Sequence, residues 1–337
     1  MTRKIRWGVL GAANIAVKKV IPAMQNGTFS EIAAIASRDS AKAKQAAGEL
    51  NIPKFYGSYE DLLADQEIDA IYNPLPNDLH VEWTVKAANA GKHVLCEKPL
   101  SLTARAAHLL IEARNRTGVK IQEGFMVRTH PQWLAVRDLI EQNRIGKLQA
   151  ITMFFSYFND DADNIRNKTE NGGGALMDIG CYCVNISRFI TNEEPRQVSS
   201  LIERDEKTGI DKLTSAMLDF PSCQSTFTCS TQLVPYQRTQ FFGTKGRIEV
   251  EIPVNITTDS STRIYVDNAG DLYGKSIETI EIPAANQYTI QGDLFSRAIL
   301  ENSEQAISLE DSIKNMAIIE AVLRAAKSGK WEIPETY

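Results

Sequence analysis

A lysine stands where a short apolar segment of the chain ends. Residues 93–96, His-Val-Leu-Cys, predict a buried strand, and Glu97, Lys98 and Pro99 come directly after it. In an open parallel sheet, ligands collect at the carboxyl ends of the strands. A lysine there can act as a point charge beside a cofactor or a developing alkoxide. A surface ion pair at a strand end is the alternative, and the tripeptide alone does not exclude it.

A carboxylate and a phenol follow a glycine-rich stretch in the second half of the chain. The three glycines at 172–174 permit close backbone approach or serve the start of a helix. The pattern then predicts a helix to about residue 190, on which Asp178 and Tyr182, four residues apart, share one face. Such a pair can perform acid–base chemistry. The alternative is a helix that buries a tyrosine whose hydroxyl bonds an aspartate.

The first strand, turn and helix of the chain form an incomplete dinucleotide fingerprint. Residues 5–10 predict a buried strand, after which Gly11 permits a tight turn and Ala16 permits close helix–strand packing. Ala13 replaces the middle glycine that lets the backbone approach a pyrophosphate. A turn with no role in cofactor binding is therefore an equally good interpretation of these residues until the next strand is considered.

The end of the next strand, 31–36, bears on the choice of cofactor. NAD-binding folds carry an acidic residue there for the ribose 2′-hydroxyl, whereas an arginine accommodates the 2′-phosphate of NADP. Here Ser37 and Arg38 stand at this position, and a hydroxyl with a guanidinium suits a phosphate. Asp39 is expected to cap the following helix, and a solvated loop arginine is the alternative for Arg38.

Strand and helix patterns alternate as far as Gly124 and then change. The alternation predicts a doubly wound parallel sheet in an N-terminal domain, 1–124. Beyond it, alternating strands and a few helices predict an α+β domain, 125–337, with an open, mostly antiparallel sheet. The fold class is therefore α/β with a second, α+β domain. The loop that ends the strand at 69–72 and the one after Cys96 then lie on the same sheet edge as Gly11.

Length and composition exclude several other classes. The 337 residues exceed one ordinary core, and the net charge of −5 argues against a nucleic-acid surface. No apolar run reaches transmembrane length, and no signal-peptide pattern precedes the first strand. Five cysteines without a framework predict reduced thiols and a cytoplasmic protein. The scattered histidines, and cysteines 181 and 183 without partners at zinc spacing, predict no metal site.

Taken together, these motifs resemble those of the Gfo/Idh/MocA oxidoreductase family from residue 5 almost to the end. The similarity rests on Glu97-Lys98-Pro99 at a strand end combined with Asp178-x-Gly180-x-Tyr182, and on the segments 73–80 and 124–131. The chain is most similar to the branch with glucose–fructose oxidoreductase, NADP-dependent xylose dehydrogenase and dihydrodiol dehydrogenase. Most of the family has histidine where Tyr182 stands, whereas this branch has tyrosine.

The resemblance implies an enzyme that transfers a hydride between a nicotinamide cofactor and a hydroxyl or carbonyl carbon of a small polyhydroxy substrate, with a sugar as the expected substrate. It implies a catalytic group of Lys98, Asp178 and Tyr182, in which the lysine cation favours the phenolate and stabilises an alkoxide. Arg128 and His130 are candidates for substrate contact, with turn residues as the alternative. NADP is expected rather than NAD, and an open sheet that often forms a dimer implies a homodimer or higher homo-oligomer, with no nucleic-acid or membrane partner.

The predicted cofactor-binding residues lie at the strand ends of the first domain: Gly11, Ala13, Asn14, Ile15, Ser37, Arg38, Pro74, Leu75, Asn77, His80, Glu97 and Lys98. Two other functions stay open. One is oxidation or reduction of a dihydrodiol or dicarbonyl compound, and the other is a non-catalytic, NADP-binding regulatory protein, because the family contains members without turnover.

Overall fold

The computed structural model describes residues 3–336, which divide into two compact units. One unit comprises residues 3–126 and 286–313, and the other comprises residues 127–285 and 314–336. The chain therefore returns to the first unit late. Helix α8 (Gln287–Leu300), assigned from the sequence to the second domain, packs on the first unit, where Ser296 accepts a 3.0 Å hydrogen bond from the indole of Trp7.

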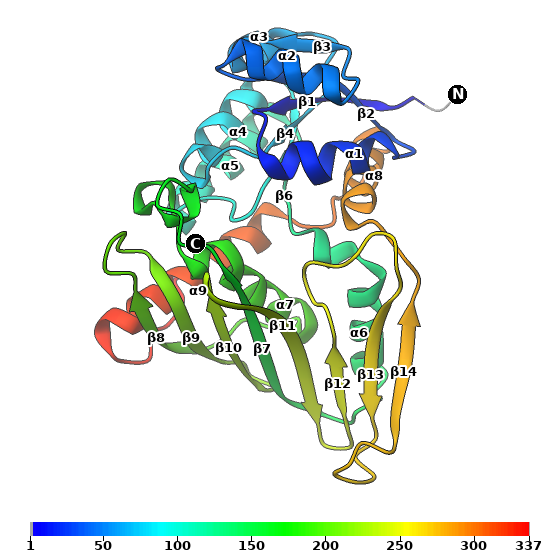
Figure 1. Ribbon diagram of the computed structural model, residues 1–337, viewed down its shortest axis with the longest axis vertical. Coiled ribbons are helices and arrows are strands. Elements are labelled where there is room, and N and C mark those ends of the chain that lie inside the picture. The colour runs from blue at the N-terminus through cyan, green and yellow to red at the C-terminus, as the bar shows by residue number, and fades with distance from the viewer. Residues whose placement is uncertain (1–2, 337) are drawn as a thin grey trace. The chain divides into compact units, whose positions relative to one another are not determined.

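The first unit is built on a six-stranded parallel sheet in the order β3-β2-β1-β4-β5-β6 (Figure 1). Its strands are β1 (Ile5–Leu10), β2 (Ser30–Ala36), β3 (Lys54–Tyr56), β4 (Ala70–Asn73), β5 (His93–Cys96) and β6 (Ile121–Glu123). The strand order reverses direction between β1 and β4, and such a switch point is where doubly wound sheets bind ligands. The predicted Rossmann sheet is confirmed, although the short strand β3 was not predicted.

Helices connect the strands of this sheet. They are η1 (Ala16–Val20), α1 (Ile21–Gln25), α2 (Ser40–Glu49), α3 (Tyr59–Ala64), η2 (Asn77–Leu79), α4 (His80–Asn89) and α5 (Ala104–Thr117). Side-chain caps fix the starts of three of them: Asp39 accepts from the amides of Ala41 and Lys42, Ser58 from Asp61, and Thr103 from Ala106. Each cap satisfies amides that the helix leaves unpaired, so the chain turns at a defined residue after each strand.

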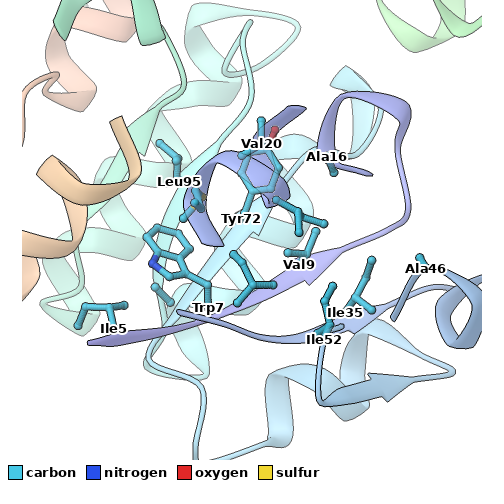
Figure 2. Packing of buried hydrophobic residues seen from close by; sticks show 14 of the residues in the cluster. Ile5, Trp7, Val9, Ala16, Val20, Ile35, Ala46, Ile52, Tyr72 and Leu95 are labelled. Carbon is cyan, nitrogen blue, oxygen red and sulfur yellow. The ribbon is translucent and has the colours of Figure 1, made fainter. Parts of the chain in front are cut away.

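The core beneath this sheet is apolar and fully enclosed (Figure 2). Trp7 and Val9 of β1 and Tyr72 of β4 have no exposed surface and pack with Ala16 and Val20 of the first helical segment. Burying a side chain of this size stabilises a fold by about 1.5–3 kcal/mol. The core thus fixes the carboxyl ends of β1 and β4, from which the loops at the switch point depart.

The second unit contains an eight-stranded sheet in the order β14-β13-β12-β11-β7-β10-β9-β8. Its strands are β7 (Leu148–Phe158), β8 (Gln197–Arg204), β9 (Asp211–Asp219), β10 (Gln224–Ser230), β11 (Gln232–Gly243), β12 (Arg247–Val250), β13 (Thr262–Asp267) and β14 (Ile277–Ile282). Neighbours are antiparallel except β7 and β10, which run parallel, so the prediction of a mostly antiparallel sheet is confirmed. The residues of β8 and β13 were not predicted to form strands.

Helices lie against one face of this second sheet (Figure 1). The longer helical segments are α6 (Pro131–Glu141), η6 (Leu176–Gly180), α7 (Cys181–Thr191) and α9 (Leu309–Ser328), and the short ones are η3 (Met126–Thr129), η4 (Ile165–Asn167) and η5 (Thr169–Asn171). Alternate residues of β7, such as Ile151, Met153 and Phe155, are buried toward these helices. The other face carries exposed apolar side chains, including Leu201, which is 80% exposed. No helix within residues 3–336 is both long enough and apolar enough to cross a membrane.

Candidate active site

The first turn of the parallel sheet brings Gly11 against two other loops. Gly11 has a φ of +84°, and its amide donates a 2.7 Å hydrogen bond to the carbonyl of Ala36. A Cβ on Gly11 would lie 3.2 Å from Leu75 Cδ2 and 3.4 Å from the hydroxyl of Tyr59. Both the positive φ and this crowding favour glycine, which lets Leu75 and Tyr59 pack closely against the buried turn at the switch point. Asn14 is exposed at the same turn, and Ala13 and Ile15 are half-buried.

The end of β2 presents Ser37 and Arg38. The hydroxyl of Ser37 accepts a 3.2 Å hydrogen bond from the amide of Asp39, whose carboxylate is engaged as the cap of α2. The exposed Arg38 hydrogen-bonds the hydroxyl of Tyr59, and burial raises the pKa of that phenol despite the arginine. Tyr59 therefore connects the arginine with the Gly11 turn. The sequence analysis missed Tyr59, because nothing in its local pattern distinguishes it from an ordinary first-turn helix residue.

His80 holds two loops of the switch-point edge together from within. Its ring is fully buried; Nδ1 lies 2.8 Å from the carbonyl of Pro99, and Nε2 lies 2.7 Å from the carbonyl of Leu75. Burial lowers the pKa of His80, whereas the two carbonyl partners favour its protonated form. Both nitrogens face backbone carbonyls, and contact of His80 with the cofactor stays a prediction. The ring ties the loop after β4 to the turn that follows Lys98.

The residues of the predicted strand-end motif are partly accessible. Glu97 and Lys98 are half-buried, as is Asn77, while Pro74 and Leu75 are buried. The hydroxyl of Tyr72 donates a 2.7 Å hydrogen bond to Oε1 of Glu97, and the amide of Glu97 donates to the carbonyl of Asn73 at 3.0 Å. Adjacent strand ends β4 and β5 are thereby cross-linked just before Lys98, which fixes where the lysine leaves the sheet.

In the second unit, the carboxylate of Asp178 has two partners from distant segments. The hydroxyl of Tyr157 at the end of β7 donates a 2.6 Å hydrogen bond to Oδ2, and Nε of Arg166 lies 3.2 Å from Oδ1. Burial raises the pKa of Tyr157 above its usual range, and the Asp178 charge raises it further. Tyr157 therefore remains a donor. The sequence analysis missed this pair, although Tyr157 stands in an aromatic strand that ends shortly before the glycine-rich stretch.

Tyr182 lies in the first turn of α7 and is only 5% exposed. Its ring centroid is 6.4 Å from that of Phe155. The segment that carries Asp178, η6, is a π-turn rather than the regular helix that was predicted, and it leads directly into α7. Asp178 and Tyr182 thus stand on one continuous helical segment. The tyrosine whose hydroxyl is seen to bond Asp178 is Tyr157.

The two weaker substrate candidates have structural partners. His130 is buried, its Nδ1 accepts a 3.1 Å hydrogen bond from the amide of Gln132, and it forms the N-cap of α6. This placement corresponds to the turn-residue alternative, and a substrate contact of His130 stays a prediction. The guanidinium of Arg128 lies 4.5 Å from the ring centroid of Phe189 and is half-buried. Within residues 3–336, no group of three or more His, Cys, Asp and Glu side chains could hold a metal ion.

The parallel sheet with its switch point and the second, mixed sheet define the class: this chain belongs to the Gfo/Idh/MocA family of oxidoreductases. Its residues 5–125 match the family's NAD-binding Rossmann fold, and residues 133–249 match the family's C-terminal domain. The recognition of the family from sequence motifs and the assignment as an oxidoreductase are confirmed.

Particular relatives narrow the comparison. The chain is 44% identical to an uncharacterized oxidoreductase of Rhizobium meliloti, with 97% of this chain and 98% of the relative covered. It is 35% identical to the NADP(+)-dependent D-xylose 1-dehydrogenase 2 of Haloferax volcanii, with 96% and 98% covered. Among solved structures, a 3-ketoreductase from Actinomadura kijaniata in complex with NADP and TDP-benzene matches with a TM-score of 0.89 and 27% identity, covering 96% of this chain and 98% of that one.

Proposed function

We propose that this oxidoreductase uses NADP to interconvert a hydroxyl and a carbonyl group on a small polyhydroxy compound, and that the substrate is a sugar. The observation that carries the proposal is Asp178, held by Tyr157 and Arg166, one helical turn before Tyr182. A carboxylate fixed from two sides beside a phenol is suited to proton transfer. The xylose dehydrogenase and ketoreductase relatives, which act on sugars or bind a TDP ligand, support the substrate class.

The residues at the strand ends of the first unit fit a dinucleotide. Gly11 forms the tight turn with positive φ that the fingerprint requires, and Ser37 with Arg38 offers a hydroxyl and a cation for a 2′-phosphate. No acidic side chain competes at that position, because the carboxylate of Asp39 caps α2. The preference for NADP over NAD is inferred from these contacts and from the NADP-dependent relatives.

We assign the chemistry to Lys98, Asp178 and Tyr182. When bound, the nicotinamide supplies hydride exchange with the substrate carbon. During oxidation the phenolate of Tyr182 takes the hydroxyl proton, and during reduction its phenol returns a proton to the carbonyl oxygen. The ammonium of Lys98 stabilises negative charge on that oxygen. Asp178, itself held by Tyr157, orients the substrate hydroxyl.

A cavity of about 690 Å³ in the second unit has a polar lining that includes Tyr157, although neither Asp178 nor Tyr182 is among the residues that line it. Tyr157, the partner of Asp178, lines it together with Tyr236, Arg238, Asn255 and Arg263. Aromatic faces with hydroxyl, amide and guanidinium groups suit a ligand that carries many hydroxyls, because each ligand hydroxyl needs a partner when it loses water.

We further propose a homodimer formed through the exposed face of the second sheet. Leu201 and Met217 stand on this face at 80% and 38% exposure, and Phe158 stands there at 61%. Apolar side chains of this size, left exposed between serines and threonines on an open sheet, favour a surface that a partner covers. All five cysteines are buried thiols, which supports a reducing, cytoplasmic location.

A substrate panel tests the proposed function. Purified protein would be incubated with NADP or NADPH and with aldoses, polyols, dicarbonyls and dihydrodiols, and the cofactor absorbance would be followed. Turnover of an aldose or polyol supports the proposal. Turnover confined to dicarbonyls or dihydrodiols would show that the enzyme acts on those compounds and not on sugars. Tight NADP binding without any turnover would identify a regulatory protein.

A further inference from the structure

Asp211, the first residue of β9, is a buried carboxylate to which the proposed mechanism gives no role. It is 4% exposed, and its Oδ2 accepts hydrogen bonds from the amide of Leu176 at 2.6 Å and from the hydroxyl of Thr214 at 2.9 Å. Leu176 begins the π-turn that carries Asp178, and no side chain of the preceding residue caps this turn. The cap comes instead from a residue 35 positions away in sequence.

The absence of a side chain at Gly174 leaves room for the same carboxylate. Its φ is +118°, and a Cβ on it would lie 1.8 Å from Oδ1 of Asp211. The carbonyl of Gly174 accepts a 3.0 Å hydrogen bond from the amide of Asp178. Asp211 therefore occupies the space that a side chain at 174 would need and bonds the amide at the start of the turn. One step of backbone hydrogen bonding separates it from Asp178.

We propose that Asp211 is a positioning residue for the active site: its ionised carboxylate fixes the turn at 174–176 and thereby the directions of Asp178 and Tyr182. A carboxylate at the N-terminal end of a helical segment also faces its positive dipole end, which strengthens the contact. This inference rests on the proposed function insofar as it assigns catalysis to Asp178 and Tyr182. The contact itself does not depend on that assignment.

The contact is sensitive to pH within the working range of most enzymes. Burial raises the pKa of Asp211 to about 6, although the Leu176 amide, the Thr214 hydroxyl and the Arg204 guanidinium favour the ionised form. The other titratable group that faces it is the thiol of Cys229, whose pKa burial raises well above its usual value, so it stays neutral. Asp211 thus loses its charge as the pH falls through about 6.

Holding this charge destabilises the folded protein. The folded-state pKa is raised above the ordinary value of 3.8, so the folded state binds the proton more tightly than the unfolded chain. The free energy of unfolding therefore decreases as the pH rises from about 4 to about 6, and the loss persists at neutral pH.

The test compares wild type with Asp211→Asn, which keeps the shape and one acceptor but cannot ionise. Asp219→Asn, at the other end of the same strand, is the matched control. For each protein, kcat, KM, the Kd for NADP and Tm would be measured between pH 5 and pH 8, with amide hydrogen exchange of residues 174–182. The exchange rates would be corrected for the intrinsic effect of pH.

We expect the kcat of wild type to decrease when the pH is lowered below about 6. The kcat of Asp211→Asn should be roughly tenfold lower than that of wild type at pH 7.5 and should not show this decrease at low pH. The Kd for NADP should be the same in both proteins. The Tm of Asp211→Asn at pH 7.5 should equal or exceed that of wild type, while exchange at 174–182 is faster. The proposal would be overturned if Asp211→Asn kept the kcat of wild type and its decrease at low pH. A lower Tm of the variant, with faster amide exchange throughout the second unit, would also overturn it. If wild type turns over no substrate, the proposed function fails, and the exchange and Tm measurements still decide whether Asp211 fixes the turn.

Discussion

The hydroxyl of Tyr157 lies 2.6 Å from Oδ2 of Asp178 and donates a hydrogen bond to it. The donor ends a strand and the acceptor stands in a π-turn, so the bond connects sheet and helix at the candidate active site. Because the pKa of Tyr157 is raised, the tyrosine does not compete with Asp178 for negative charge. The orientation of Asp178 is therefore set by the fold before any substrate binds.

Removing the Tyr157 hydroxyl is expected to impair catalysis without affecting the cofactor. A hydrogen bond to a charged group contributes about 1.5–3 kcal/mol, so Tyr157→Phe should lower kcat roughly tenfold to a hundredfold. The Kd for NADP should not change. Tyr265→Phe, on a neighbouring part of the same sheet, is the control. Equal kcat values for Tyr157→Phe and wild type would show that Arg166 alone suffices to hold Asp178.

Tyr182→Phe tests the proton-transfer role directly. Loss of a positioned acid or base lowers the rate by about 10²–10⁴, and we expect a decrease of this size in kcat. The ring and its packing against Phe155 remain, so NADP binding and Tm should be retained. Lys98→Met should lose at least as much activity and should also bind the cofactor more weakly. Near-normal turnover in Tyr182→Phe would assign the proton transfer to Lys98 or to a water held by Asp178.

Arg38→Ala tests the cofactor preference. A charge-assisted contact to the 2′-phosphate contributes about 1.5–3 kcal/mol, so the Kd for NADP should rise roughly tenfold to a hundredfold while that for NAD stays nearly constant. Fluorescence titration with both cofactors measures this. Tyr59→Phe, which removes the hydroxyl bonded to Arg38, should give a smaller change in the same direction. Equal losses for NADP and NAD would mean that Arg38 supports the loop and not the phosphate.

His80→Phe tests the internal link between the two loops. The variant fills the space but leaves the carbonyls of Leu75 and Pro99 without their ring partner, and each unsatisfied buried group costs about 1–3 kcal/mol. We expect a lower Tm and a Kd for NADP that is roughly tenfold higher than that of wild type. His108→Phe, on the exposed side of α5, is the matched control. An unchanged Kd for NADP would show that the loops keep their positions without the ring.

A charge on the exposed face of the second sheet should prevent self-association. Leu201→Glu replaces a largely exposed apolar side chain of this face by a carboxylate, and burying it in an interface without a partner is unfavourable. Light scattering at micromolar concentration should give a dimer for wild type and a monomer for the variant. Glu203→Gln, two residues further along β8, serves as the control. A wild type that is monomeric at this concentration would contradict the proposed dimer.

The sequence by itself determined the parallel sheet, the family and the positions of the chemical groups. Strand 93–96 and the turn at Gly11 were predicted because each depends on residues within a few positions, the strand on its apolar run and the turn on its glycine. Lys98, Asp178 and Tyr182 could be chosen because strand ends and helix faces follow from such local patterns.

The tertiary structure decided what those groups touch. Tyr157 and Asp211 come from strands distant in sequence from the turn that carries Asp178, and no periodicity encodes a contact made across 21 or 35 residues. The sequence motif predicts that His80 binds the cofactor, whereas the fold buries its ring between two backbone carbonyls. Helix α8 joins the first unit because its buried side chains pack on β1, which only the folded chain brings near it. Long-range packing and hydrogen bonding therefore fixed the partners, whereas local patterns fixed the elements.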